Sequence, residues 1–454
     1  MDTPQVIVVG GGLAGCECAW QLAERGVVVQ IREMKPLRRT PAQSSDALAE
    51  LVCSNSFRSD NPLNAIGLLH EELRALGSLV LRLADRHRVP AGDALAVDRD
   101  LFSADVERHV RQHPMITVVA GEVTALPLAL GVPVVVATGP LTSDALAAQL
   151  VAVTGQERLA FYDAIAPIVA AESIAMPQVF AASRWGKGDG DDYLNCPMDK
   201  AQYLAFVEAV VAAETLPLQD FELGVRYFPG CQPIEVVAQS GPKSLRFGPM
   251  KPTGLDDPRT GRWPYAVVQL RAENRHKTAY NLVGFQTKMR QAEQRRVLGM
   301  IPGLGEAEFL RYGSVHRNTF LDSPRLLDDA MRLRSLPQLR FAGQITGVEG
   351  YIESTASGWW TALALDAELR GVALAPPPAD TALGALVRHV VDTTVPQFQP
   401  SNLHFGLFEP LDDARDPQTG KKRDKPARKQ AMCDRARASL RQWHVATGRT
   451  PACG

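Results

Sequence analysis

Six residues near the N-terminus place glycines at a spacing that suits phosphate binding. Gly10-Gly11-Gly12-Leu13-Ala14-Gly15 fits the pattern GxGxxG, follows the apolar run 5–10 and opens a segment with helical periodicity. In such a pattern Gly10 permits a tight turn, Gly12 lets the backbone approach a pyrophosphate, and Gly15 lets the helix pack closely on the strand. The helix N-terminus offers N–H donors and the positive end of its dipole to phosphate groups.

An acidic residue follows the next predicted strand. The apolar run 27–32 leads into Glu33 and Met34. Glu33 can accept hydrogen bonds from ribose hydroxyls and would repel a 2′-phosphate, so this site is expected to reject NADP. A glycine-rich turn without a ligand is the alternative, but the order strand, turn, helix, strand and acid favours a dinucleotide site.

Two later glycine-containing junctions favour FAD over NAD as the dinucleotide. One is the strand end at Ala137-Thr138-Gly139. A second strand-to-helix junction, more than three hundred residues after the first, could meet the far end of a long cofactor and support negative charge on a reduced flavin. The residues predicted to bind FAD at these junctions are Thr138, Gly139, Gly343, Gln344, Thr346, Gly347 and Gly350.

Two cysteines lie among turn residues, where exposure is common. Cys53 lies in LVCSNSFRS, and Cys231 lies in YFPGCQPIE. Arg58 and Arg226 are close in sequence to these thiols and could favour the thiolate. Packed, unreactive thiols remain the alternative on the residues alone.

The elements that must position these groups alternate between strand and helix. Helix is predicted at 13–24 and 65–83, and strands at 5–10, 27–32 and 134–137. The polar segment 36–64 is predicted to be a long loop with some helix. Between about 165 and 335 short strands and Pro-Gly breaks replace this alternation of strand and helix. An apolar strand is predicted again at 339–342, followed by a helix at 353–369 and a Pro-rich linker or loop at 371–384.

These elements predict an α/β fold with an insertion. Residues 1–165 would form the first part of a Rossmann-type FAD-binding domain. A smaller α/β (α+β) domain would be inserted at 166–335. Residues 336–454 would complete the FAD-binding domain and carry a basic C-terminal tail. That tail, 420–444, carries nine Lys and Arg residues against two Asp. It is a candidate for phosphate contacts, and a solvated charged helix is the alternative.

Bulk composition limits the alternatives. The chain has 454 residues, is 45% hydrophobic and has a formal net charge of -1, so any RNA-binding surface must be a local patch. The seven cysteines are odd in number and irregularly spaced, which argues against a disulfide framework, and no paired CxxC or HxxxH predicts a metal site. No apolar run reaches the length of a membrane span, so a cytoplasmic protein without a membrane partner is expected. Cys16 and Cys18 are assigned to the first helix, and Cys196 to a turn in DYLNCPM.

The sequence resembles a known family, the folate- and FAD-dependent tRNA uracil-5 methyltransferases (TrmFO, or Gid). The matching segments occur in order along nearly the whole chain. They include VIVVGGGLAGCECAWQLA, ELVCSNSFRSD, VVVATGPLTS, GCQPIEVVA, LRFGPMKPTGL, YNLVGFQTKM, FAGQITGVEGYIES and QPSNLHFGLF.

The resemblance implies a reaction and residue roles. The family makes 5-methyluridine at position 54 of the tRNA T-loop, with 5,10-methylenetetrahydrofolate as carbon donor, reduced FAD as reductant and NAD(P)H to reduce the flavin. Cys231 matches the thiol that attacks uracil C6, and Cys53 matches the second catalytic cysteine, which removes the C5 proton. Pro229, Gln232 and Phe57 depart from the usual family pattern near these thiols, which puts pocket detail in doubt.

Other functions are compatible with some of the same residues. The same chemistry could act on ribosomal RNA. An FAD oxidoreductase for a small molecule would explain the glycine motifs but not the cysteine turns. A non-catalytic RNA-binding flavoprotein would leave the thiols idle. The sequence does not decide between a monomer and a homodimer.

Overall fold

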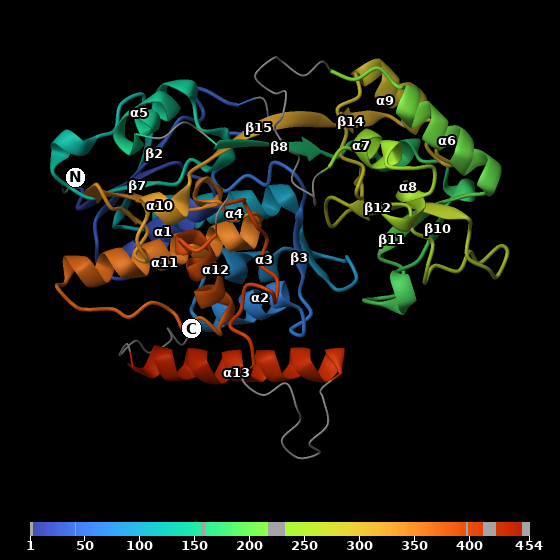
Figure 1. Cartoon of the computed structure of the whole chain (residues 1–454). Coiled ribbons are helices and arrows are strands. Elements are labelled where there is room, and N and C mark those ends of the chain that lie inside the picture. The colour runs from blue at the N-terminus through green and yellow to red at the C-terminus, as the bar shows by residue number, and fades with distance from the viewer. Residues whose placement is uncertain are drawn as a thin grey trace.

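The computed structural model describes residues 3–40, 42–155, 159–216, 232–395, 398–411 and 424–446, with the backbone alone described at 159–165 and 315–318. Figure 1 shows two lobes joined across the top by a pair of long strands, with a C-terminal helix along the bottom of the first lobe. Cys231, Arg226 and the first three cations of the basic tail lie outside the described residues.

The first lobe is built on a mainly parallel six-stranded sheet. The strand order is β16-β17-β7-β1-β2-β6, and only the pairing of β16 with β17 is antiparallel. The central strand β1 is wholly apolar and buried, as expected when helices cover both faces. The strands are β1 (Val6–Val9), β2 (Val29–Glu33), β6 (Ile116–Ala120), β7 (Val134–Val136), β16 (Arg332–Leu333) and β17 (Leu336–Phe341).

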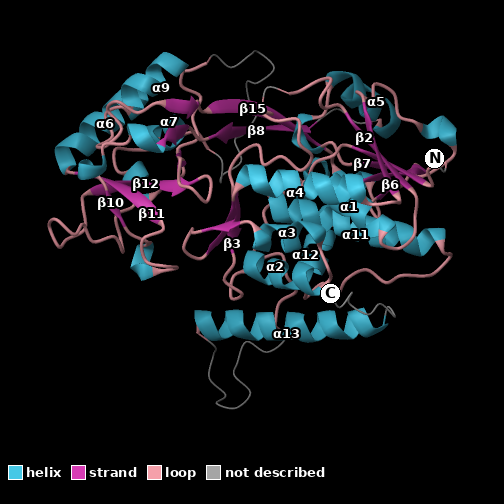
Figure 2. Cartoon of the chain, turned by 180° about the vertical axis from the view of Figure 1, so that it is seen from behind, coloured by secondary structure: helices cyan, strands magenta, loops and turns pink. Residues whose placement is uncertain are grey.

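Two long-separated helices pack together on this sheet. Helix α1 (Leu13–Ala23) contacts α11 (Tyr351–Leu369), and a Cβ atom on Gly358 would lie 2.2 Å from the carbonyl oxygen of Ala14. Glycine at this position therefore lets the two helix backbones touch. The other helices of this lobe are α2 (Ala65–Ala75), α3 (Leu79–Arg86), α4 (Arg99–Gln112), α5 (Asp144–Thr154), α10 (Ser323–Leu326), α12 (Ala382–Val391) and α13 (Lys425–Ala446). Figure 2 shows several of them covering one side of the lobe.

The second lobe is an antiparallel sheet backed by helices. Its strand order is β10-β11-β12-β13-β9-β14, and its core is separate from that of the first lobe. The strands are β9 (Ile168–Ala170), β10 (Phe180–Ala181), β11 (Tyr193–Met198), β12 (Ala266–Ala272), β13 (Ala279–Leu282) and β14 (Phe309–Arg311). The helices are α6 (Lys200–Ala212), α7 (Ile234–Gln239), α8 (Ser244–Phe247) and α9 (Gln291–Leu298).

The chain leaves and re-enters the first lobe through one strand pair. Strand β8 (Leu159–Ile165) leads out, β15 (Ser314–Phe320) leads back, and the two are antiparallel over their whole length. A smaller sheet of β3 (Ser56–Ser59), β5 (Ala94–Val97) and β4 (Arg88–Val89) lies on the side of the first lobe that faces the second.

Three local expectations from the sequence need correction. The segment predicted as one helix at 65–83 is two helices, because Gly77 adopts φ +74° and the Ser78 hydroxyl caps α3 by accepting from the N–H of Leu81. Cys196 lies in strand β11, not in a turn, and is fully buried. The described part of 36–64 contains β3 and no helix.

A buried carboxyl group joins α2 to α12 and gives a pH-dependent stability. Glu72 accepts the N–H groups of Ala382 and Leu383 at 2.8 Å, and burial raises the pKa of Glu72 to about 8. This value exceeds the pKa of a glutamate in the unfolded chain, about 4.3. The folded protein therefore binds a proton at Glu72 more tightly than the unfolded chain does, and the resulting stabilisation of the fold is complete at low pH. It is lost as the pH rises through about 8.

We expect the free energy of unfolding in urea to fall less between about pH 5 and pH 8 in Glu72→Gln than in the wild type, because glutamine does not titrate. An equal fall in both proteins would contradict the assignment.

Candidate active site

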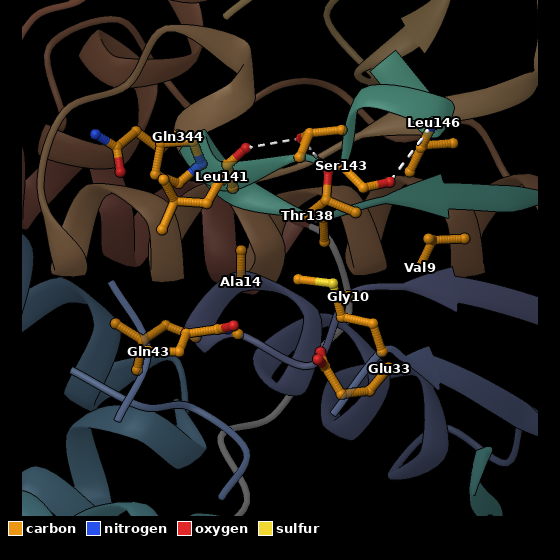
Figure 3. Close-up of a pocket in the computed structure, with 18 of the residues that line it drawn as sticks. Val9, Gly10, Ala14, Glu33, Gln43, Thr138, Leu141, Ser143, Leu146 and Gln344 are labelled. Carbon is orange, nitrogen blue, oxygen red and sulfur yellow. Dashed lines mark hydrogen bonds between the residues drawn. The ribbon is translucent and has the colours of Figure 1, made fainter. Parts of the chain in front are cut away.

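The two glycine junctions of the first lobe meet around one elongated cavity of about 1030 Å³, counted with its open mouth. Strands β1, β2 and β7 end at its wall, as expected for a ligand site at the carboxyl edge of a parallel sheet. Figure 3 shows Glu33 on one side of the cavity and Gln344 on the opposite side. Of the predicted cofactor residues, those that line it are Gly10, Gly12, Leu13, Ala14, Glu33, Met34, Thr138, Gly139, Gly343 and Gln344.

The other predicted cofactor residues do not line this cavity. Gly15 packs against the first turn, since its Cβ would lie 1.9 Å from the carbonyl oxygen of Gly10. Thr346 is fully buried, and its hydroxyl donates to the carbonyl oxygen of Gly343 at 2.8 Å. Gly347 packs against the ring of Phe398. Gly350 directly precedes α11 and has a φ of +120°. The backbone N–H of Gly11 donates a hydrogen bond to the Glu33 carboxylate. These five residues shape the junctions behind the cavity wall.

The geometry of the first turn fits a dinucleotide. A Cβ atom on Gly12 would meet no atom within 4 Å, so the absent side chain leaves open space beside the cavity. No side chain caps the N-terminus of α1 and its first turn carries no acid, which leaves its N–H groups to an anionic ligand. Glu33 is nearly buried and accepts from the N–H groups of Gly11 at 2.6 Å and Lys35 at 3.0 Å. Each carboxylate oxygen retains a lone pair for a ribose hydroxyl.

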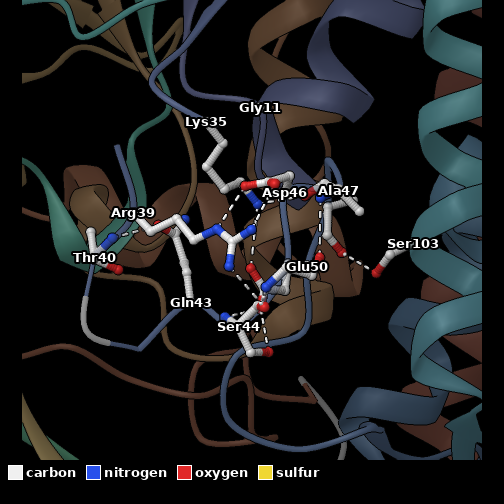
Figure 4. A network of polar contacts seen from close by, with 12 residues as sticks. Gly11, Lys35, Arg39, Thr40, Gln43, Ser44, Asp46, Ala47, Glu50 and Ser103 are labelled. Atoms are coloured by element: carbon white, nitrogen blue, oxygen red, sulfur yellow. Dashed lines mark hydrogen bonds and ion pairs between the residues drawn. The ribbon is translucent and has the colours of Figure 1, made fainter. Parts of the chain in front are cut away.

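The segment after β2 is folded around a second buried carboxylate. Glu50 accepts the N–H groups of Ser44 at 2.7 Å and Ser45 at 3.1 Å, and its other oxygen lies 3.3 Å from the Lys35 ammonium (Figure 4). Gln43 and Glu50 both line the cavity. The loop therefore forms a structured wall of the site.

Cys53 lies at the start of the β3 segment and is held against α11. The hydroxyl of Tyr351 accepts the N–H groups of Cys53 at 2.7 Å and Ser54 at 3.0 Å. Tyr351 also lines the cavity, so the chain around Cys53 is fixed directly to its wall. The Cys53 side chain is half-buried, which leaves it accessible to a small reactant.

Two arginines, Arg58 and Arg311, have interactions around the Cys53 corner. The guanidinium of Arg58 lies 2.9 Å from the buried carboxylate of Glu353 in α11, and this ion pair anchors the Cys53 segment. Burial, and next the like charge of Arg99, lowers the pKa of Arg311. Cys53 and Tyr351 act on the Arg311 guanidinium in the opposite sense, which places both groups within its electrostatic reach. A cation at this range, here Arg311, favours the thiolate form of a cysteine.

Sequence reasoning missed Tyr351, Arg99 and Arg311. Tyr351 directly follows Gly350 in a segment already recognised as a junction, so an aromatic residue at a helix start was an available signal. Arg99 is the first residue of α4, in the first lobe. Arg311 is the last residue of β14, in the second lobe. Neither belongs to a motif, and only the docking of the lobes brings them together.

The other described cysteines are structural in their surroundings. Cys16, Cys18, Cys196 and Cys433 are buried. Burial raises the pKa of Cys18 to about 12 and that of Cys433 to about 11. Such thiols stay protonated at neutral pH and are poor nucleophiles.

The basic tail is divided between structural and exposed cations. Helix α13 packs on the first lobe through Met432, Cys433 and Trp443, and Arg437 lies 2.8 Å from Glu71. The exposed cations of the helix are Lys425, Arg428 and Arg441.

None of the described helices has both the length and the apolar composition needed to cross a bilayer. Within the same residues, no three His, Cys, Asp or Glu side chains gather in an arrangement that could hold a metal ion.

Tyr351→Phe is expected to lower the stability of the Cys53 corner. The variant keeps the ring but leaves the N–H groups of Cys53 and Ser54 without their acceptor, a loss of about 1–3 kcal/mol. Thermal denaturation should show this loss, and the rate of any reaction that uses Cys53 should fall with it. Tyr312→Phe is the control, since its hydroxyl accepts from exposed Arg295 at 2.6 Å and its loss should cost under about 0.5 kcal/mol. Equal stabilities of the two variants would refute the anchoring role.

The fold and the cavity define a class: an α/β protein with a Rossmann-type FAD-binding fold. Comparison with solved structures agrees, because two crystal forms of Aquifex aeolicus GidA superpose with TM-scores of 0.67 and 0.66 at 14% identity, covering 97% and 98% of this chain and 73% and 78% of theirs. The family model described as glucose inhibited division protein A matches residues 5–373.

Comparison with curated sequences gives a closer assignment. The chain is 56% identical to the methylenetetrahydrofolate–tRNA-(uracil-5-)-methyltransferases TrmFO of Rhizorhabdus wittichii and Geobacter sulfurreducens. Each alignment covers 97% of this chain, and 98% and 99% of the respective relative. The chain belongs to the TrmFO family within the GidA group.

Proposed function

We propose that this protein methylates C5 of uridine 54 in the T-loop of tRNA, with 5,10-methylenetetrahydrofolate as carbon donor and NAD(P)H as the final reductant. The observation that carries the proposal is the 56% identity to TrmFO relatives over 97% of the chain. The cavity and the anchored Cys53 supply compatible chemistry. We also propose the division into 1–165, 166–335 and 336–454, and the cytoplasm, where tRNA is modified, as the site of action.

In the proposed mechanism Cys231 begins the reaction. Uracil C5 is a poor nucleophile, and addition of the Cys231 thiolate to C6 converts the ring into an enolate that is nucleophilic at C5. C5 then attacks the methylene carbon of methylenetetrahydrofolate, and the bond from that carbon to one of its two folate nitrogens breaks. A base in a folded T-loop must first leave its stack, which costs a few kcal/mol.

Cys53 is proposed to complete the transfer. As thiolate it takes the proton from C5, and tetrahydrofolate then leaves the methylene carbon, which becomes an exocyclic methylene group. After a hydride adds to that carbon, departure of the Cys231 thiolate from C6 restores the uracil ring. Tyr351 fixes the Cys53 backbone during the proton transfer, and Arg311 stabilises the negative charge of the Cys53 thiolate. FAD, held by Gly12, Glu33 and the N-terminus of α1 and reduced by NAD(P)H, would supply the hydride that reduces the transferred carbon to a methyl group.

A covalent trap tests the proposed class of reaction. Tritiated 5-fluorouracil in a T-arm RNA cannot release its C5 substituent as a proton, so the thiol adduct at C6 should accumulate. We expect a denaturation-stable RNA–protein complex with wild type and none with Cys231→Ala. An oxidoreductase for a small molecule would give no complex, and a non-catalytic RNA-binding protein would give binding that denaturation reverses.

A further inference from the structure

The second lobe carries large aromatic side chains that are exposed to solvent. The side chains of Trp185 and Trp263 are 65% and 48% exposed, and their ring centroids lie 5.9 Å apart in an edge-to-face arrangement. Phe247 is 69% exposed. We call Trp185, Trp263 and Phe247, together with Arg246 and Tyr265, the aromatic surface. Clusters of exposed apolar side chains on a folded protein mark sites of interaction.

The position of Trp185 is maintained against backbone strain. Trp185 has φ +58°, in the left-handed region that a bulky residue rarely adopts. Its ring lies against the chain at Gly254, where a Cβ atom would come within 2.6 Å of the indole. The backbone N–H of Trp185 donates to the Gly254 carbonyl at 3.0 Å. Strained residues of this kind concentrate at ligand-binding positions. The indole is therefore presented to solvent in a fixed orientation.

Cations are interleaved with the rings. The Arg246 guanidinium lies 4.5 Å from the ring centre of Tyr265 and 5.8 Å from that of Phe247. Segment 243–263 carries five Lys and Arg residues against two Asp, a formal charge of +3. Among the residues that the structure describes, Lys243, Lys251 and Arg262 form no ion pair, while Asp257 is paired with Arg259 at 2.8 Å.

The surface also adjoins the lobe that carries Cys53. Arg184, next to Trp185, donates to three neutral acceptors, the carbonyls of Lys251 and Thr253 and the Gln269 side chain. Arg184 and Lys187 border a hollow of about 560 Å³ whose opposite wall includes Ser59 of β3 and Gly92. Lys187 pairs with Asp93 there, and the exposed Asp189 and Asp191 follow in the same loop. The net positive charge is thus concentrated on segment 243–263.

We infer that the aromatic surface is a contact site for the RNA substrate, where the indoles of Trp185 and Trp263 stack on unpaired bases and the neighbouring cations contact phosphates. Every base has a π face, so such stacking suits single-stranded or looped RNA, and interleaved arginines add cation–π contacts. A protein partner would also use Trp and Arg, but protein interfaces are depleted in lysine, whereas Lys243 and Lys251 remain unpaired here. The inference rests on the proposed function, because it assumes an RNA substrate.

The test uses the full-length, flavin-loaded protein and a fluorescently labelled T-arm hairpin RNA. The test variant is Trp185→Asn/Trp263→Ser, since asparagine tolerates the left-handed conformation at 185. The control is Leu130→Ser, which removes a 55% exposed apolar side chain from the first lobe. We expect the double variant to bind RNA at least about tenfold more weakly, given what base stacking contributes, with kcat at saturating RNA unchanged. RNA should quench the intrinsic Trp fluorescence of wild type and of the control but not of the double variant.

Two results would overturn the inference. One is wild-type RNA affinity and quenching in the double variant. The other is a shift in sedimentation, with RNA affinity intact, which would assign the surface to a second copy of the chain. A wild-type protein that neither binds nor modifies the hairpin would instead refute the proposed function, so the two failures are distinguishable.

Discussion

A Gly12→Val variant is expected to fold normally and to be purified without flavin. Gly12 has an ordinary extended conformation, with φ -75° and ψ -172°, and its Cβ would enter open space, so the apo fold should tolerate a side chain there. That space borders the cavity at the uncapped N-terminus of α1, where a pyrophosphate needs close backbone approach. We expect the Kd for FAD to rise by at least about 100-fold, about 2.8 kcal/mol at 1.4 kcal/mol per tenfold change.

The measurement is a titration of apoprotein with FAD, followed by flavin fluorescence, together with the melting temperature of each apoprotein. Gly305→Val is the matched control, because Gly305 also lacks a positive φ and its Cβ would meet nothing closer than 3.8 Å. This control should bind FAD as the wild type does. A Gly12→Val protein that stays yellow with unchanged affinity would show that the flavin does not bind in this cavity.

Cys53→Ala should lower the rate of methyl transfer by on the order of 10²–10⁴, the usual contribution of a general base. Removal of the thiol should leave the backbone contacts to Tyr351 intact, since these come from the N–H groups of Cys53 and Ser54. Flavin content and RNA affinity should therefore be unchanged. The measurement is single-turnover formation of 5-methyluridine at saturating RNA and folate.

Cys196→Ala is the matched control for a thiol without a chemical role. Cys196 is fully buried in β11, within the core of the second lobe, so its loss should reduce stability and leave the rate constant near that of wild type. A rate loss in Cys196→Ala equal to that in Cys53→Ala would indicate that both changes act through folding alone.

The parts of the site that are local in sequence could be predicted from it. Strand β1, the glycine turn, helix α1 and the acid at Glu33 all lie within about thirty residues, and each has a residue pattern of its own. The return of the chain to the first sheet at β17 could also be predicted, because an apolar strand followed by glycines and a helix repeats the first junction.

The corner around Cys53 could not be predicted in the same way. Tyr351 and Arg311 come from segments far from Cys53 in the chain, and their approach depends on how α11 and the second lobe dock. Arg58 is the partner that proximity in sequence suggests, and the sequence does not predict its positive φ of +72° or its ion pair with the buried Glu353.

The segment predicted as a turn around Cys196 is a strand that contains a proline. Pro197 follows Cys196 and pairs with Val267 inside β11. Among the residues that the structure describes, strand β10 pairs only with Leu194 and Asn195, so β11 is an edge at Pro197 and no described partner there requires an N–H group. Sheet position decides whether a proline breaks a strand, and that position is not encoded locally.

The most direct test of the account is nucleoside mass analysis of a tRNA incubated with the flavin-loaded protein, isotopically labelled methylenetetrahydrofolate and NADPH, with position mapping by nuclease digestion. We expect 5-methyluridine at position 54, carrying the labelled carbon, from wild type and none from Cys231→Ala. Flavin-loaded wild type that yields no labelled 5-methyluridine in tRNA would contradict it. If the label then appeared in ribosomal RNA, the chemistry would stand and the substrate would change.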